Sequence, residues 1–226
     1  IICFFLRDAW STGRTLATQF SFDAMRGVTE LTVIAPDHPR LLSIIAGACA
    51  AAGANIVDAQ IFTTTDGLAL DTIAVTREFE HDEDEARRAG RIADTIEKAL
   101  RGEIKLPDIV ARKAVSKSRL KAFALEPEVN INNEWSNRFT VVEVTGLDRP
   151  GLLYELTSTI SRLSLNIASA HVATFGERVV DVFYVTDLLG AKIASPTRQA
   201  AIKRALLALF ARPAAYEAKQ AAKARA

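Results

Sequence analysis

The stretch that decides the fold is TELTVIAPDHPRLL, residues 29–42, because it returns as TVVEVTGLDRPGLL at residues 140–153. In both copies a run of β-branched and apolar residues leads to an Asp, a Pro and then two leucines. The correspondence continues at Asn55-Ile56 and Asn166-Ile167. Self-similarity of this kind indicates two copies of one module rather than one large domain.

Each copy carries the pattern strand, helix, strand, strand, helix. In the first copy, residues 31–35 favour a strand, and Leu41, Leu42 and Ile45 lie at helical spacing before Gly53, which is typical of a helix end. Asp66-Gly67 is a tight-turn signal between two further strands. The second copy repeats this plan, and Asp181 there matches Asp71. The predicted fold class is α+β: two ferredoxin-like βαββαβ modules in tandem, with antiparallel sheets and helices on one face.

A βαββαβ module needs a fourth strand, and its expected position sets the predicted boundaries. For the first copy the candidate lies far downstream, whereas nothing after Phe210 resembles a strand, so we expect the second copy to lack its last strand or to borrow one. We expect residues 1–27 to be the tail of a preceding domain or a linker, and residues 213–226 to be a C-terminal tail. The first module is predicted at 28–134, with a basic linker at 101–121 and its last strand at about 128–132. The second module is predicted at 137–212.

Composition excludes several classes of function. A net charge of +1 gives no global field that would attract nucleic acid or a membrane surface. An aromatic content of 7%, with Leu31, Val33, Val142 and Val144 on the central strands, lacks the stacking residues of an RNA-binding sheet. The two cysteines form no metal-binding or disulfide pattern and fit a reducing cytoplasm. The chain offers no paired acid and base, no nucleophile beside a histidine and no metal cluster, so we expect no catalytic residue, no metal ligand and no cofactor in it.

The motif Asp-x-Pro-Gly-Leu-Leu at 148–153, followed by Asn-Ile at the next strand, resembles the ACT-domain signature. The resemblance covers residues 28–212. Residues 61–72 and 169–185 resemble more specifically the C-terminal ACT pair of the bifunctional PII uridylyltransferase/uridylyl-removing enzymes. The first copy departs from the motif, because Arg40 stands where the loop glycine is expected. This departure favours the second loop as the ligand cradle.

The resemblance implies a cytoplasmic regulatory region. Its effector would be L-glutamine, and its partners would be the PII signal protein and the catalytic domains that precede the ACT pair in that family. Those domains, and not this chain, would use a divalent metal ion, Mg²⁺ by expectation. ACT modules of separate chains would also pair into a homo-oligomer. The alternative is a free-standing ACT-repeat amino-acid sensor or adaptor without catalytic domains, and the tail-like residues 1–27, which lack an initiator Met, speak against it.

Two kinds of residue carry the predicted site. Asp37 and Asp148 precede a helix and could accept hydrogen bonds from the ammonium of an amino acid, or they could be ordinary helix caps. Asn55 and Asn166 could read a side-chain amide, or they could be turn residues. Together with the loop residues beside them, of which His38 and Arg149 could equally face solvent, the predicted ligand-binding set is Asp37, His38, Asn55, Asp148, Arg149, Gly151, Leu152, Asn166 and Ile167.

Overall fold

A computed structural model of the chain describes residues 16–107, 109–110 and 125–211. Its strands are β1 (Ala17–Asp23), β2 (Val28–Pro36), β3 (Ile56–Thr63), β4 (Leu68–Thr76), β5 (Glu128–Asn132), β6 (Thr140–Leu147), β7 (Leu165–Phe175) and β8 (Arg178–Asp187). Its helices are α2 (Leu41–Ala52), α3 (Asp82–Leu100), α5 (Leu152–Arg162) and α6 (Pro196–Phe210). Of the helices within these ranges, none combines the length and the apolar character needed to cross a membrane.

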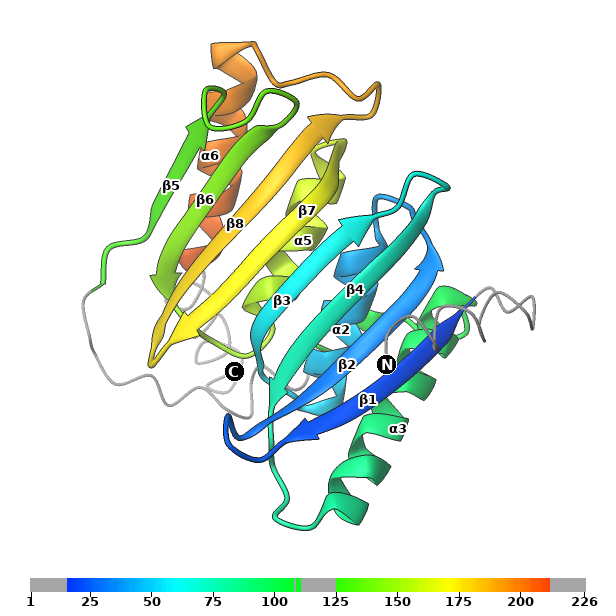
Figure 1. The fold of residues 1–226 in the computed structure, drawn as a ribbon. Coiled ribbons are helices and arrows are strands. Elements are labelled where there is room, and N and C mark those ends of the chain that lie inside the picture. Colours follow the sequence, from blue (N-terminus) through cyan, green and yellow to red (C-terminus); the bar gives the residue numbers. More distant parts are fainter. Residues whose placement is uncertain (1–15, 108, 111–124, 212–226) are drawn as a thin grey trace, which may run out of the picture.

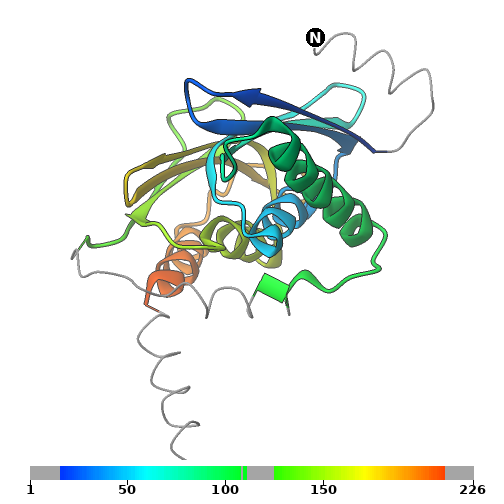
Figure 2. The ribbon, with the colours of Figure 1, turned by 90° about the horizontal axis from the view of Figure 1, so that it is seen from below.

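The strands form one antiparallel sheet in the order β1-β2-β4-β3-β7-β8-β6-β5 (Figure 1). The first four strands of this order belong to one copy of the repeat and the last four to the other. The four helices cover the same face of the sheet (Figure 2). The predicted α+β class with two tandem ferredoxin-like modules is therefore confirmed.

Alternation along the strands explains which face the helices cover. In β2 the side chains of Leu31, Val33 and Ala35 are buried against the helices, while Thr32 between them is on the opposite face and only half-buried. α2 carries no charged residue, which suits a helix packed between the sheet and its neighbours α3 and α5. The buried apolar residues of both modules belong to one continuous core, so the modules are joined by packing as well as by strand pairing.

The two modules meet along an approximate two-fold axis. β3 pairs with β7 so that Gln60 lies opposite His171, and these two residues occupy equivalent places in the repeat. On the helix side of this axis α2 packs against α5. A Cβ atom at Gly47 of α2 would lie 2.8 Å from Cδ2 of Tyr154 on α5, so the absent side chain gives the two helices their close approach. The packing of ACT modules side by side thus occurs within this one chain.

The prediction that residues 128–132 form the fourth strand of the first module is wrong. Residues 128–132 form β5, which pairs with β6 of the second module, and the edge of the first module is filled by β1. Gly27, at φ 63°, helps to close the turn that places β1 beside β2. In each module the fourth strand of the sheet is thus the segment that directly precedes the first predicted strand: β1 before β2, and β5 before β6. A local hairpin loses less entropy on loop closure than a pairing with a distant strand does. The second module lacks nothing, and residues 17–23 belong to the first module rather than to a tail.

The acidic run after β4 is partly helical. Asp82, Glu83, Asp84 and Glu85 form the first turn of α3, where negative charges interact favourably with the helix dipole. Glu85 is buried and forms an ion pair with Arg88 at 2.7 Å. In the linker, Leu106 and Val110 are buried, so this part packs on the modules. The predicted C-terminal tail, residues 111–121 of the linker and the first fifteen residues lie outside the described ranges.

Candidate functional site

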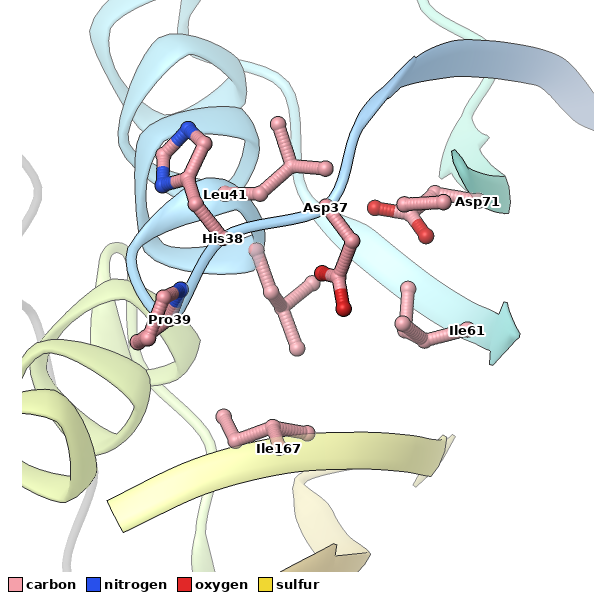
Figure 3. A pocket seen from close by; sticks show the side chains of 9 residues that line it. Asp37, His38, Pro39, Leu41, Ile61, Asp71 and Ile167 are labelled. Carbon is pink, nitrogen blue, oxygen red and sulfur yellow. The ribbon is translucent and has the colours of Figure 1, made fainter. Parts of the chain in front are cut away.

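The first candidate pocket lies at the loop between β2 and α2 (Figure 3). The backbone N–H of Asp37 donates to the carbonyl oxygen of Gly67 in the β3–β4 turn over 2.9 Å, which fixes the loop against the sheet. The Thr63 hydroxyl donates to the Asp37 carboxylate over 3.0 Å. The lining residues come from the loop, from α2, from β3 and β4, and from β7 of the other module: Asp37, His38, Pro39, Leu41, Leu42, Ile61, Ala69, Asp71 and Ile167.

The second pocket lies at the equivalent loop between β6 and α5. Here the backbone N–H of Asp148 donates to the carbonyl oxygen of Glu177 in the β7–β8 turn over 2.7 Å. This hydrogen bond is equivalent to the one between Asp37 and Gly67 in the first loop. The Arg149 guanidinium donates two hydrogen bonds, of 3.1 and 2.6 Å, to the Glu155 carboxylate and one to the carbonyl oxygen of Leu209. The lining residues are Ala46, Ala50, Ala54, Asn55, Ile56, Asp148, Arg149, Gly151, Leu152, Leu153 and Tyr154.

Each pocket combines a loop of one module with a strand start of the other. Asn55 and Ile56 of the first module face the second loop, where the Asn55 side chain lies close enough to the Asp148 carboxyl to lower its pKa. Ile167 of the second module faces the first loop. The two-fold axis thus brings the strand start of each module to the loop of the other. Asn166 lines neither pocket, and its buried Oδ1 has no hydrogen-bond partner.

Neither aspartate caps a helix, so one of the two alternatives for these residues is excluded. The residues that precede the helices are Arg40 before α2 and Gly151 before α5, and neither aspartate accepts a hydrogen bond from a helix start; at α2 the backbone N–H of Arg40 donates to Nδ1 of His38 over 3.3 Å. Gly151 adopts φ 82°, which favours glycine, whereas Arg40 adopts φ −107°, which any residue can take. The backbone therefore explains why the first loop does without the glycine of the motif.

Burial shifts the proton affinities of the loop residues. It raises the pKa of the Asp148 carboxyl, although hydrogen bonds from Asn55 and from the backbone N–H of Arg149 lower that pKa in part. Burial also lowers the pKa of His38, so its imidazole is neutral near pH 7. A carboxylate beside the free N–H groups of a helix start offers one partner for an ammonium group and one for a carboxylate. Such a site suits a zwitterion.

The sequence did not single out two further acids, Asp71 on β4 and Asp181 on β8. Each is 1% exposed, on the helix-facing side of its strand. Burial, together with the nearby Asp37 carboxylate, raises the pKa of Asp71 to about 8; burial and Asp148 do the same for Asp181. The available signal was an acid at an inward position of an apolar alternation, present in both copies. Among the described residues, no group of three or more His, Cys, Asp and Glu side chains is placed to hold a metal ion.

The fold and the paired loops are those of tandem ACT modules, and comparison with known proteins agrees. The ACT domain family model matches residues 29–97 and 140–200, so the chain belongs to the ACT domain family.

The chain is similar to proteins with the name bifunctional uridylyltransferase/uridylyl-removing enzyme. The chain is 66% identical over 213 residues to the protein of that name from Nitrobacter hamburgensis, which covers 94% of the chain and 23% of the relative. It is 69% identical over 207 residues to that from Bradyrhizobium sp. strain ORS 278, covering 92% of the chain and 22% of the relative. The similarity is to the C-terminal part of these enzymes. The chain thus spans less than a quarter of the length of these relatives.

Proposed function

We propose that the chain is the amino-acid-sensing regulatory region of a bifunctional uridylyltransferase/uridylyl-removing enzyme, with L-glutamine as its effector. The observation that carries the proposal is the second pocket, which is lined together by Asp148 of one module and Asn55 of the other across the module interface. In this proposal the catalytic steps, and their action on the PII signal protein, belong to parts of the enzyme outside this chain.

The pocket chemistry fits an α-amino acid. The Asp148 carboxylate would accept hydrogen bonds from the ligand's ammonium group, and the start of α5 would face its carboxylate. The Asn55 side chain has both a donor and an acceptor, so it can pair with a primary amide. A ligand with an amide side chain would thus be distinguished from one with a carboxylate by hydrogen bonding across the interface.

A ligand held between two modules can act on a distant site. It stabilises only those arrangements in which both halves of its pocket are present, and it therefore shifts any equilibrium that changes how the modules pack. The joint between β3 and β7, with α2 against α5, is the element on which such a shift would act. We expect ligand binding to stiffen this joint and so to change how the pair presents itself to the catalytic domains.

Isothermal titration of the chain with L-glutamine, with L-glutamate as comparison, tests the proposal. We expect binding selective for glutamine. Asp148→Asn and Asn55→Ala should each weaken it by about tenfold or more, which is the loss of one hydrogen bond to a charged or amide group. Asp94→Asn, on the exposed face of α3, makes the same charge change away from both pockets and should leave the affinity unchanged. Equal affinity for both amino acids, or binding indifferent to both pocket variants, would contradict the proposal.

A further inference from the structure

The first pocket contains a buried carboxyl group for which the protein supplies no partner. Asp71 is 1% exposed, it lines the pocket, and neither of its carboxyl oxygens has a hydrogen-bond partner. Figure 3 shows its carboxyl directed toward the loop that carries Asp37. Buried polar groups without partners are rare in proteins because each costs free energy, so this one calls for an explanation.

The walls of this pocket supply negative charge and apolar surface. Asp37 provides a second carboxyl, and the remaining wall includes Leu42, Ile61 and Ile167. No Lys or Arg side chain is among the lining residues, and the ring of His38 points away from the two carboxyls (Figure 3). Two carboxyls in an apolar setting repel each other when both are ionised, and a cation between them removes that repulsion.

We propose that the first pocket is a subsite for a primary ammonium group, held between the carboxylates of Asp37 and Asp71, and that its binding releases a proton from Asp71. This proposal rests on the proposed function in one respect, namely that an amino acid is the natural carrier of the ammonium group. An ammonium group has three N–H donors, enough to satisfy oxygens of both carboxylates. It also fits the end of a narrow apolar pocket better than a larger guanidinium would.

The proton balance follows directly. Without ligand Asp71 holds its proton at neutral pH, because burial and the Asp37 carboxylate raise its pKa to about 8. When R–NH₃⁺ enters, the carboxylic acid loses its proton to the buffer and the carboxylate accepts a hydrogen bond from the ammonium. No other bond is made or broken. Affinity should therefore rise with pH until Asp71 is ionised in the free protein.

The other titratable groups near β4 do not change charge in the same range. His38 has a pKa lowered by burial, which disfavours its charged form in this range. Cys49 of α2 has its pKa raised by burial to about 12 and stays protonated. From α3, Glu85 and Arg88 pair with each other at the far end of β4, where Arg88 donates to the carbonyl oxygen of Thr76. Among the groups that face the first pocket, Asp71 is thus the one that titrates between pH 6.5 and 8, and substitution of Asp181 separates its proton from that of the equivalent acid near Asp148.

The second module supplies a matched control. Asp181 is the repeat equivalent of Asp71, with a pKa also raised by burial to about 8, but it does not line the second pocket. Asp181→Asn therefore makes the same chemical change in the equivalent strand while it leaves the first pocket intact.

The test is calorimetric titration of the chain with L-glutamine and, separately, with methylammonium chloride, between pH 6.5 and 8.0. Running each titration in phosphate and in Tris, whose ionisation enthalpies differ, counts the protons released. For the unaltered chain we expect an affinity about 15-fold higher at pH 8.0 than at pH 6.5, and release of nearly one proton at the lower pH. Asp71→Asn should abolish the pH dependence and the proton release, and Asp181→Asn should preserve both. Asp37→Asn, in a part-exposed loop, should shift the pH dependence to lower pH.

The outcomes separate this proposal from the proposed function. Glutamine binding without proton release, or release that persists in Asp71→Asn, overturns the subsite and leaves glutamine sensing in place. Methylammonium binding with proton release, but no glutamine binding, supports the subsite and contradicts glutamine sensing. If methylammonium competes with glutamine, the subsite takes the ammonium group from either source, and if only glutamine binds, the carrier is the amino acid. Binding of neither probe at any pH overturns both proposals.

Discussion

Substitution of Asp71 by Asn should change how the stability of the chain depends on pH. The folded-state pKa of this carboxyl is about 8, well above the value of about 3.9 in an unfolded chain. The folded state therefore binds the proton more tightly. Its contribution to stability is full below the unfolded pKa and is lost as the pH rises through the folded pKa.

The size of this effect follows from the two pKa values. Between them, each pH unit removes about 1.4 kcal/mol from the free energy of unfolding. From pH 5.0 to pH 7.5 the loss due to Asp71 amounts to about 3 kcal/mol. The Asn side chain has nearly the same shape and does not ionise, so the variant lacks this loss. Asp181 contributes its own loss in both proteins and cancels from the comparison.

Urea denaturation followed by circular dichroism, at several pH values between 5.0 and 7.5, measures the difference. We expect the unaltered chain to lose about 3 kcal/mol more than the Asp71→Asn variant over this range. The variant should thus gain relative stability as the pH rises. Parallel stability curves for the two proteins would refute the reasoning, because they would mean that Asp71 is ionised in the folded state at pH 5.0.

Four further substitutions test the packing and the backbone conformation. Glu85→Ala leaves the buried guanidinium of Arg88, only 4% exposed, without its 2.7 Å carboxylate partner on α3, and urea denaturation should show a loss of about 3–5 kcal/mol. Gly151→Ala forces φ 82° on a residue with a Cβ atom and should lower the free energy of unfolding by about 1–2 kcal/mol. Gly90→Ala lies inside α3 with open space around it and should raise the free energy of unfolding by about 0.5–1 kcal/mol. Equal effects of the two substitutions would contradict the conformational argument. Ser195→Ala removes the side-chain acceptor at the start of α6 and should lower the stability by about 1 kcal/mol in thermal or urea denaturation.

The ACT family and the α+β fold are confirmed. Glutamine as effector, the PII partner, the divalent metal in other domains, the cytoplasmic location and pairing between separate chains stay predictions. The proposed titrations address the first of these directly.

The sequence by itself determined the module and its number of copies. Periodic apolar positions and turn residues act locally, so the strand, helix, strand, strand, helix order could be predicted from each copy alone. The Asp-x-Pro loop before α2 and α5 was also predictable, because the motif repeats at 37–42 and 148–153. Of the nine predicted ligand-binding residues, all but Asn166 line one of the two pockets.

Only the tertiary structure decided which parts meet. The pairing of β3 with β7 places Asn55 beside Asp148 of the other module, and nothing in the separation of these residues along the chain indicates that contact. Each edge strand pairs with the strand that follows it in the sequence, β1 with β2 and β5 with β6, because loop closure favours local hairpins. The sequence also contains no sign that the Asp71 carboxyl lacks a hydrogen-bond partner. Whether a carboxyl finds a hydrogen-bond donor depends on every element that surrounds it, and that environment exists only once the two modules have packed into one sheet.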